Sequence, residues 1–289
     1  MIIWFSGGLG NHMFQYALYR TAQSLGYDVK ADLSFYDNKE CHNGYELERI
    51  FNIRLNKCTA QESSKFVDRM DYFSRVIRKL GATSFGIREN KIIENYSKHI
   101  DDLLDVKNKN KYLQGYWQSE KYFKSIESTL KQEFVFPKLI DNKNEEVAQS
   151  IKNSNSASIH VRRGDYLSHS IYYALGESNY YNNAINYLLN ECASINFYIF
   201  SDDIDWCRTN LNLPINTVYI DWNKNQDSYI DMQLMSMCKY NIIANSSFSW
   251  WGAFLNKNKE KIVVAPQNWF AEDSGYDASL IVPEDWVKL

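Results

Sequence analysis

Two adjacent arginines, Arg162 and Arg163, stand at the end of a short apolar run and are followed by Gly164 and Asp165. A guanidinium is planar, always charged and able to bind two oxygens at once, so such a pair suits a diphosphate. Alternation along a strand places His160 and Arg162 on one side. Asp165 would orient or neutralise one arginine, and a purely structural Arg–Asp pair is the competing interpretation. The segment therefore predicts an anion-binding site.

A second candidate for anion binding is the segment 245–252, where small hydroxyl side chains open an expected helix. Ser246, Ser247 and Ser249 follow an apolar strand. Hydroxyl and N–H groups at a helix start bind phosphate oxygens, whereas simple N-capping would explain the same residues. We interpret the two tryptophans that follow as packing residues.

A glycine-rich turn lies between the first expected strand and the first expected helix and contains Gly8, Gly10 and Asn11. Glycines let the backbone approach a ligand closely, and a helix start offers N–H groups to an anion. The turn also matches the first half of a dinucleotide fingerprint, with Asp32 near the acidic position, but Met13 occupies the third glycine position. An anion site, a nucleotide site and a turn without a ligand all stay open.

The acidic segment 201–205 follows another expected strand. A carboxylate from Asp202 or Asp203 at this point could accept hydrogen bonds from a nucleotide base or ribose. Asp203 and Asp205 also match the Asp-x-Asp pattern of metal-dependent glycosyltransferases. However, Asp203 fits a helix N-cap, and Asp205 would lie in a first helical turn, where acids are favoured anyway.

Strand-length apolar runs alternate with helix-period segments on both sides of a polar stretch at 137–156, which we interpret as a linker or a domain boundary. Strands are expected at residues 2–5, 29–33, 112–117, 157–162, 196–201, 218–221, 241–244 and 261–265. Helices are expected at residues 11–25, 119–134, 179–193, 203–211, 227–237 and 248–255, with mostly helix and loop at 38–110. The alternation predicts an α/β fold with parallel sheets. We expect two units, 1–140 and 141–289, with a cleft between them.

The bulk composition excludes several classes of protein. The 32 basic and 35 acidic residues give a net charge of −3, which argues against a nucleic-acid binder that relies on bulk charge. No stretch approaches the roughly 20 apolar residues of a membrane span. The five cysteines show no metal or redox spacing, which favours reduced thiols in a cytoplasmic protein. The 8 Trp and 21 Tyr fit either an aromatic core or a groove that stacks on sugars.

In their order along the chain, the four segments resemble those of the α-1,2-fucosyltransferases, which share a His-x-Arg-Arg-x-Asp motif with α-1,6- and protein O-fucosyltransferases. The resemblance runs from Gly7 to the segment 265–270. Residues 7–16 are similar to the N-terminal signature of the family, except that His12 stands where the family typically carries Gln. The resemblance implies two Rossmann-like domains facing across a cleft (the B-type glycosyltransferase fold), GDP-β-L-fucose as the donor, inversion at the anomeric carbon and no obligatory metal or cofactor.

The resemblance also implies a role for each site residue. Arg162 is the first candidate for the catalytic cation, and His12 is a candidate base, although the family's Gln could not act as one. The donor-binding candidates are His160, Arg162, Arg163, Asp165, Asp202, Asp203, Ser246, Ser247, Ser249, Gly8, Gly10 and Asn11. The acceptor-binding candidates are Tyr116, Trp117 and Gln118. Units 1–140 and 141–289 would then be the acceptor side and the GDP-fucose-binding side.

The reaction implied is direct displacement of GDP by the 2-hydroxyl of a terminal β-galactose, in an oligosaccharide or a surface polysaccharide such as an O-antigen. Fixed positive charge would stabilise the departing GDP. The alternatives are a B-type glycosyltransferase with another donor or linkage, an NAD-dependent oxidoreductase resting on Gly8, Gly10 and Asp32, and a non-catalytic sugar-binding protein. We expect at most peripheral association with the inner face of the cytoplasmic membrane.

Overall fold

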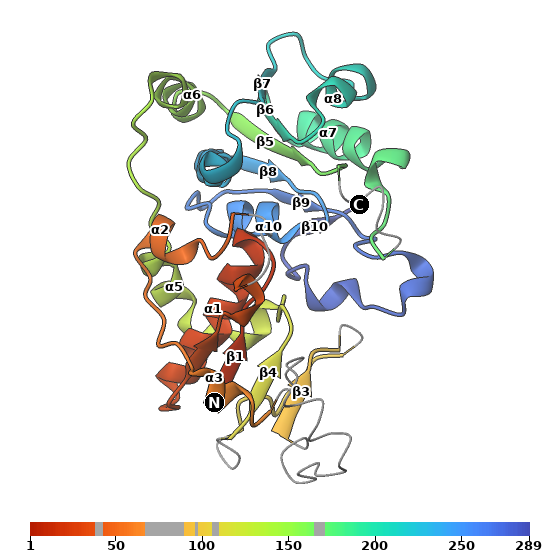
Figure 1. Ribbon diagram of the computed structural model, residues 1–289. Coiled ribbons are helices and arrows are strands. Elements are labelled where there is room, and N and C mark those ends of the chain that lie inside the picture. Colours follow the sequence, from red (N-terminus) through yellow and green to blue (C-terminus); the bar gives the residue numbers. More distant parts are fainter. Residues whose placement is uncertain (38–42, 67–89, 96–97, 106–109, 165–170) are drawn as a thin grey trace. The chain divides into compact units, whose positions relative to one another are not determined.

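The chain forms two compact units, Met1–Phe134 and Val135–Leu289, which divide near the boundary expected at residue 140. The computed structural model describes residues 1–37, 43–66, 90–95, 98–105, 110–164 and 171–289 (Figure 1). Each unit is built on its own parallel sheet, so the expected α/β class is confirmed. Among the described residues, no helix is both long enough and apolar enough to cross a membrane.

The N-terminal unit has a four-stranded sheet in the order β2-β1-β4-β3, and all neighbouring strands are parallel. Its strands are β1 (Ile2–Trp4), β2 (Lys30–Asp32), β3 (Lys91–Ile93) and β4 (Tyr112–Gln114). Helix α1 (Leu9–Ser24) connects β1 to β2 and is followed by Gly26 with φ of +82°, as expected for a C-terminal glycine. Within the described residues of this unit, the other helices are α2 (Leu47–Phe51), α3 (Ala60–Ser63) and α5 (Glu127–Glu133).

The helix expected at 119–134 is shorter than predicted. Two 3₁₀ turns, η3 (Glu120–Tyr122) and η4 (Lys124–Ile126), precede α5. Phe123 and Ile126 leave the helical backbone region, with φ of −138° and −121°. Both side chains are buried, so their packing overrides the helical pattern of the polar residues between them.

The C-terminal unit has a six-stranded sheet in the order β10-β9-β8-β5-β6-β7, again entirely parallel. Its strands are β5 (Ser156–Val161), β6 (Asn196–Ser201), β7 (Val218–Ile220), β8 (Tyr240–Ile242), β9 (Val263–Ala265) and β10 (Val287–Lys288). Ile159 of β5 pairs with Ile242 of β8 on one side and with Ile199 of β6 on the other. The segments that follow these three strands therefore emerge side by side at the carboxyl edge of the sheet.

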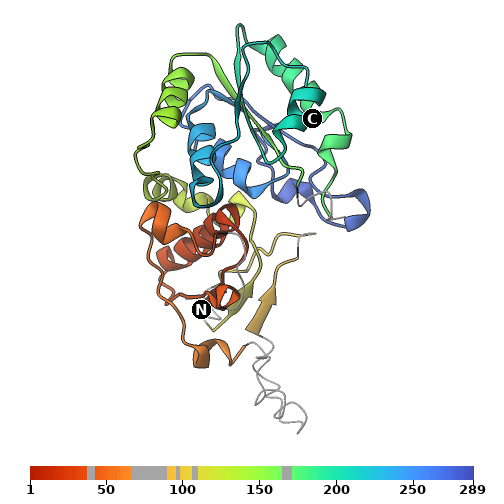
Figure 2. The ribbon, with the colours of Figure 1, turned by 45° about the horizontal axis from the view of Figure 1, so that its top comes forward.

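Helices cover both faces of the C-terminal sheet (Figure 2). They are α6 (Asn142–Lys152), α7 (Tyr180–Glu191), α8 (Ile204–Asn210), α9 (Tyr229–Met237) and α10 (Ser247–Phe254). Ile159 and Val161 pack into one buried cluster with residues of α7 and α8. The alternate residue His160 lies on the other side, against Phe248 of α10, with 5.7 Å between ring centroids. This alternation separates a structural face of β5 from the face that carries the candidate site.

The polar stretch at 137–156 contains helix α6 and is not simply the linker that we expected. Val147, Ala148 and Ile151 form its short buried stripe, while most other positions are polar. The Asp141 carboxylate accepts a hydrogen bond of 2.8 Å from the Asn144 N–H and caps the helix. Three apolar residues in a polar sequence give a weak helical signal, which explains why this helix was not predicted.

Asn241 of β8 links three elements of the C-terminal core and is 1% exposed. Its amide nitrogen donates to Ser158 Oγ and to the Met235 carbonyl, both at 2.8 Å, and its oxygen accepts from Asn256 Nδ2 at 2.8 Å. Replacing it would leave several buried polar groups without partners.

We therefore expect Asn241→Leu to lower the free energy of unfolding by about 2–4 kcal/mol, measured by urea denaturation. The matched control is Asn212→Leu, the same change at an exposed position, which should cost less than about 0.5 kcal/mol. Equal losses in the two variants would contradict the role of the buried amide network.

Candidate functional site

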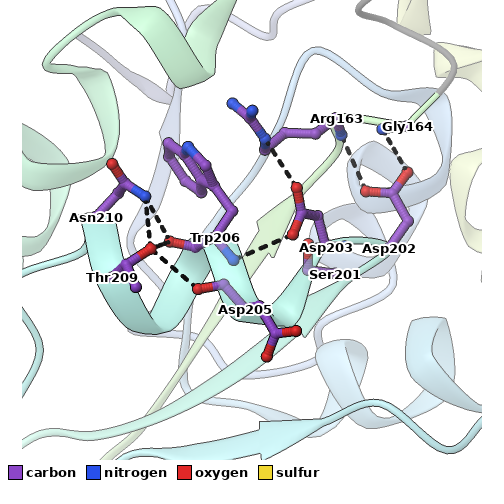
Figure 3. Close-up of polar contacts among 9 residues, drawn as sticks. All are labelled: Arg163, Gly164, Ser201, Asp202, Asp203, Asp205, Trp206, Thr209 and Asn210. Carbon is purple, nitrogen blue, oxygen red and sulfur yellow. Dashed lines mark hydrogen bonds and ion pairs between the residues drawn. The ribbon is translucent and has the colours of Figure 1, made fainter.

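The carboxylate of Asp202, directly after β6, holds the chain turn that follows β5. Asp202 Oδ1 accepts from the Arg163 N–H at 3.0 Å, and Oδ2 accepts from the Gly164 N–H at 3.1 Å (Figure 3). Arg162 Nη1 lies 3.3 Å from the same Oδ2. A Cβ at Gly164 would lie 2.9 Å from that oxygen, so the close approach requires glycine. The sequence suggested that Asp202 contacts the ligand, but here its oxygens are engaged in shaping the arginine turn.

The two arginines of the turn have different surroundings. Arg163 donates through Nε to Asp203 Oδ2 at 3.2 Å, and its guanidinium lies 4.5 Å from the centre of the Trp206 ring. Its side chain is 17% exposed, whereas that of Arg162 is 34% exposed. Arg163 is therefore packed into the α8 side of the turn, and Arg162 presents the more accessible positive charge.

Asp203 is the N-cap of α8, one of the alternatives left open by the sequence. Its Oδ1 accepts from the Trp206 N–H at 3.1 Å, while Oδ2 is paired with Arg163. Asp205 lies exposed in the first turn of the same helix. The described part of the chain contains no group of three or more His, Cys, Asp or Glu side chains that could hold a metal ion.

His160, at the penultimate position of β5, is a buried and uncharged imidazole. It is 7% exposed, and no described group forms a hydrogen bond with its Nδ1. Burial, together with the nearby positive charge of Arg162, lowers the pKa of His160 to about 3. The ring thus places a neutral polar nitrogen close to Arg162 and does not repel the positive charge of that side chain.

The serines at the start of α10 have separate roles. Ser246 is the N-cap and accepts from the Phe248 N–H at 3.3 Å, so the capping interpretation is confirmed. Ser247 is partly exposed in the first turn. Ser249 is fully buried and donates back to the Ser246 carbonyl at 3.3 Å, so it does not face a ligand as expected. The two tryptophans that follow are fully buried, as expected of packing residues.

These features converge because β8, β5 and β6 are neighbours in one sheet. The start of α10 follows β8, Arg162 follows β5 and Asp202 follows β6, so a helix N-terminus and a guanidinium meet at one edge. Helix N-terminal N–H groups and a fixed cation together make an anion site. Asp165, which was also expected here, lies outside the described residues.

A buried polar cluster between α6, the segment after β7 and α9 was missed by the sequence analysis. Asn223 Nδ2 donates to Asp231 Oδ1 at 2.8 Å and to Asn144 Oδ1 at 3.1 Å. Burial raises the pKa of Asp231 to about 7. Acidic residues are common in the first turn of a helix, so the sequence around Asp231 did not indicate a functional site. The useful signal was the polar residue Asn223, which lies shortly after the end of β7 at Ile220.

In the N-terminal unit, the glycine turn brings together residues that the sequence had assigned to two different ligands. Asn11 Oδ1 accepts from Gln118 Nε2 at 2.7 Å. Gly7 has φ of +82°, and a Cβ there would lie 2.4 Å from Asn11 Nδ2. Gly8 precedes α1 and is partly exposed, whereas Gly10 is buried in its first turn. The loop after β4 and the glycine turn therefore form one hydrogen-bonded surface.

Two other expected residues of this unit are buried. His12 is 0% exposed, and its Nε2 is hydrogen-bonded with the Tyr36 hydroxyl. Trp117 is also 0% exposed and adopts φ of +58°. Neither side chain faces an acceptor in this arrangement, because packing encloses both rings. Tyr116 is half-buried, and its N–H donates to Glu94 Oε2 at 2.6 Å.

Two carboxylates of the N-terminal unit are already engaged by the protein. Glu46 is 2% exposed and accepts a hydrogen bond from the backbone of Leu9, in the first turn of α1. Burial raises the pKa of this carboxyl. Asp32 is 4% exposed and accepts from the Tyr112 hydroxyl at 2.9 Å and from the Ser34 N–H at 2.9 Å. The start of α1 thus has the Glu46 carboxyl as an internal hydrogen-bond partner, and Asp32 does not face a ribose.

Comparison with known proteins gives a consistent assignment across the whole chain. The model of the family described as Glycosyl transferase family 11 matches residues 2–289. An α-1,2-colitosyltransferase of Escherichia coli is 33% identical over 98% of this chain and 97% of its own length. The O-antigen biosynthesis glycosyltransferase WbnK, also of Escherichia coli, is 33% identical over 98% of each chain.

Among solved structures, NodZ α-1,6-fucosyltransferase soaked with GDP-fucose has a similar fold. The superposition has a TM-score of 0.51 and covers 88% of this chain and 91% of that chain, at 12% sequence identity. At this identity the similarity concerns the fold alone. It confirms the B-type glycosyltransferase fold that the sequence resemblance implied.

The raised pKa of Asp231 predicts a pH-dependent stability. The unfolded chain releases this proton near the ordinary aspartate pKa of 3.8, whereas the folded protein keeps it up to a pH of about 7. The carboxyl therefore destabilises the fold increasingly as pH rises from about 4 to about 7, and fully above that. The side chain of Asp231→Asn stays neutral at every pH. The Tm of this variant minus that of the wild type should therefore be at least about 3 °C larger at pH 8 than at pH 4.5.

The control for this pH series is Asp227→Asn, which alters an exposed acid in the preceding 3₁₀ turn. Its Tm difference from the wild type should stay constant over the same range. A constant difference for Asp231→Asn as well would show that this carboxyl is ionised in the folded protein throughout.

Proposed function

Because the chain belongs to glycosyl transferase family 11, we propose that it is an inverting α-1,2-fucosyltransferase. It would move L-fucose from GDP-β-L-fucose to the 2-hydroxyl of a terminal β-galactose in an oligosaccharide or a surface polysaccharide. Family membership makes the protein a glycosyltransferase and excludes the oxidoreductase alternative, which the burial of Asp32 also disfavours. The observation that carries the proposal is the turn held by Asp202, which presents Arg162 beside the start of α10.

The donor diphosphate is assigned to the carboxyl edge of the C-terminal sheet. Departure of GDP leaves additional negative charge on the oxygen that was bonded to the sugar. Arg162 and the N–H groups at the start of α10 supply fixed positive potential for that charge. Ser246 and Ser247 add hydroxyl groups, and the neutral His160 adds a polar nitrogen that does not repel Arg162.

The base of the donor is assigned to the polar cluster around Asp231. Guanine carries adjacent N–H donors on one edge, and a carboxylate accepts two such bonds at once. Asn223 already binds Oδ1, and no described group is found hydrogen-bonded to Oδ2. The cluster follows β7 in the same sheet as the arginine turn. Donation by guanine would favour the ionised carboxylate and lower the raised pKa of Asp231.

The acceptor is assigned to the N-terminal unit, Met1–Phe134. The partly exposed groups available there are Gly8 of the glycine turn, with Asn11, and Tyr116 and Gln118 of the loop after β4. These polar and aromatic groups suit a sugar, which has hydroxylated edges and an apolar C–H face. Trp117 would support the loop from within the core.

The reaction is a single displacement. The acceptor hydroxyl oxygen forms a bond to the anomeric carbon and its proton is released to solvent, while the bond to GDP breaks and its electron pair leaves with the phosphate oxygen. Stabilisation of the leaving group is then the main contribution of the protein, through Arg162 and the start of α10. We assign no base, since His12 is enclosed by other side chains.

Transfer of colitose in an α-1,2 linkage is the second candidate, favoured by the 33% identity to an α-1,2-colitosyltransferase over the whole chain. Both candidates use the same site and differ in the sugar of the donor. Parallel assays with GDP-fucose and GDP-colitose separate them, and the better donor is the one with the higher kcat/KM.

We expect the full chain to release GDP from GDP-fucose in the presence of a β-galactoside and EDTA, with a Fuc-α-1,2-Gal product identified by NMR. The site supplies its own positive charge, so chelation should leave the rate unchanged. Transfer that requires added manganese would instead favour a metal site built on Asp203 and Asp205. No transfer from either donor would refute the proposed activity.

Arg162→Ala should reduce kcat by more than the roughly 100-fold that is typical of losing one transition-state donor. Arg208→Ala is the matched control, because Arg208 stacks on Tyr219 at 4.0 Å on the surface of α8 and has no assigned role. Circular dichroism would establish that both variants fold. A folded Arg162→Ala protein with near-normal kcat would remove this residue from the mechanism.

A further inference from the structure

We infer that His12 is a positioning residue, which acts through Tyr36 to fix the peptide between Gly7 and Gly8 at the start of α1. The inference rests on the proposed function in one respect, namely that the glycine turn contacts a substrate. It gives the buried histidine a role other than the catalytic base that its titration behaviour suggested.

The hydroxyl of Tyr36 lies at the centre of this relay. This hydroxyl donates to the Gly7 carbonyl at 2.8 Å and is also hydrogen-bonded with Nε2 of His12. A phenol has one proton, so the hydroxyl that donates to Gly7 must accept from His12. His12 is thereby assigned as the tautomer that carries its proton on Nε2. A ring in this state could accept a proton only at Nδ1, which is buried.

The imidazole ring of His12 is enclosed by neighbouring aromatic side chains. His12 is 0% exposed, and its ring centroid lies 5.5 Å from that of Tyr36 and 5.6 Å from that of Tyr45. Tyr36 ends the 3₁₀ turn η1 (Ser34–Tyr36), which directly follows β2. The relay therefore connects the first turn of α1 to the segment after the neighbouring strand β2.

The relay fixes the direction of the Gly8 N–H. A trans peptide is planar, with its C=O and N–H groups pointing in opposite directions. Fixing the Gly7 carbonyl on Tyr36 therefore aims the Gly8 N–H away from it. Gly8 is partly exposed, and no hydrogen bond from its N–H to any described residue is found. The relay thus presents one oriented N–H donor to a ligand oxygen, either a sugar hydroxyl or a phosphate oxygen.

A positioning role also accounts for His12 standing where the family typically carries Gln. A glutamine amide also offers an N–H donor at the end of its side chain, so it could donate to the same hydroxyl. It could not act as a base. A positioning role is compatible with either residue, whereas a catalytic base is compatible with histidine alone.

The kinetic test compares four variants with GDP-fucose and lactose. Tyr36→Phe and His12→Leu each break the relay and should lower kcat on the order of tenfold, the size of one hydrogen bond. His12→Gln keeps a donor and should stay within about threefold of the wild type. Tyr27→Phe is the control, because it also removes a hydroxyl that donates to a backbone carbonyl at 2.8 Å, that of Leu104. It should leave kcat unchanged.

Each of these outcomes decides between roles. Wild-type kcat in Tyr36→Phe would overturn the relay. A loss in His12→Gln as large as that in His12→Leu would return His12 to the role of base. Tyr36→Phe keeps the ring and tests the inference even if His12→Leu fails to fold.

A second readout does not depend on activity. Nitrogen-15 NMR of the histidines should show His12 neutral, with its proton on Nε2 and protected from solvent exchange. In Tyr36→Phe that protection should fall, since the acceptor is gone. A proton on Nδ1 would refute the relay even in an active enzyme, and the spectrum remains decisive if the protein proves not to transfer fucose.

Discussion

The Asp202 carboxylate joins the ends of two neighbouring strands, and the geometry of the candidate donor site depends on it. It receives two backbone N–H groups from the turn after β5 and is paired with Arg162. The parallel register of β5 and β6 brings the two strand ends together. Glycine at position 164 removes the side chain that would block the contact. Backbone and guanidinium are thus oriented by one group before any ligand binds, which is the condition for electrostatic stabilisation at little reorganisation cost.

Some of the surrounding residues support the arginine turn, and others are exposed enough to contact a ligand. Arg163 is packed on Trp206 and paired with Asp203, and a Cβ at Gly176 would lie 2.3 Å from its Nη1. Such a residue supports the turn and has little freedom to follow a ligand. Arg162 is twice as exposed, at 34% against 17%. In the N-terminal unit, the His12 relay orients a backbone donor in the same indirect way.

Much of this architecture could be predicted because the apolar patterns of the strands and the residue types at their ends indicated the same fold. The strand at 157–162, the arginine pair and the capping Asp203 are local features, so sequence sufficed for them. The α6 helix was missed because only three apolar residues mark it, and Asp231 was missed because its burial depends on Asn144 and Asn223 from distant parts of the chain. His12, Trp117 and Ser249 were assigned to ligands, although tertiary packing buries them. Composition reveals which groups could do chemistry, but only the fold decides which of them reach a surface.

The most direct test of the account is a calorimetric comparison of GDP and GMP binding to the full chain in EDTA. The site proposed here places Arg162 and the start of α10 on the diphosphate, so the second phosphate should contribute much of the affinity. GDP is predicted to bind at least about tenfold more tightly than GMP, equivalent to about 1.4 kcal/mol. Equal dissociation constants for the two nucleotides would contradict the assignment of the arginine turn to the diphosphate.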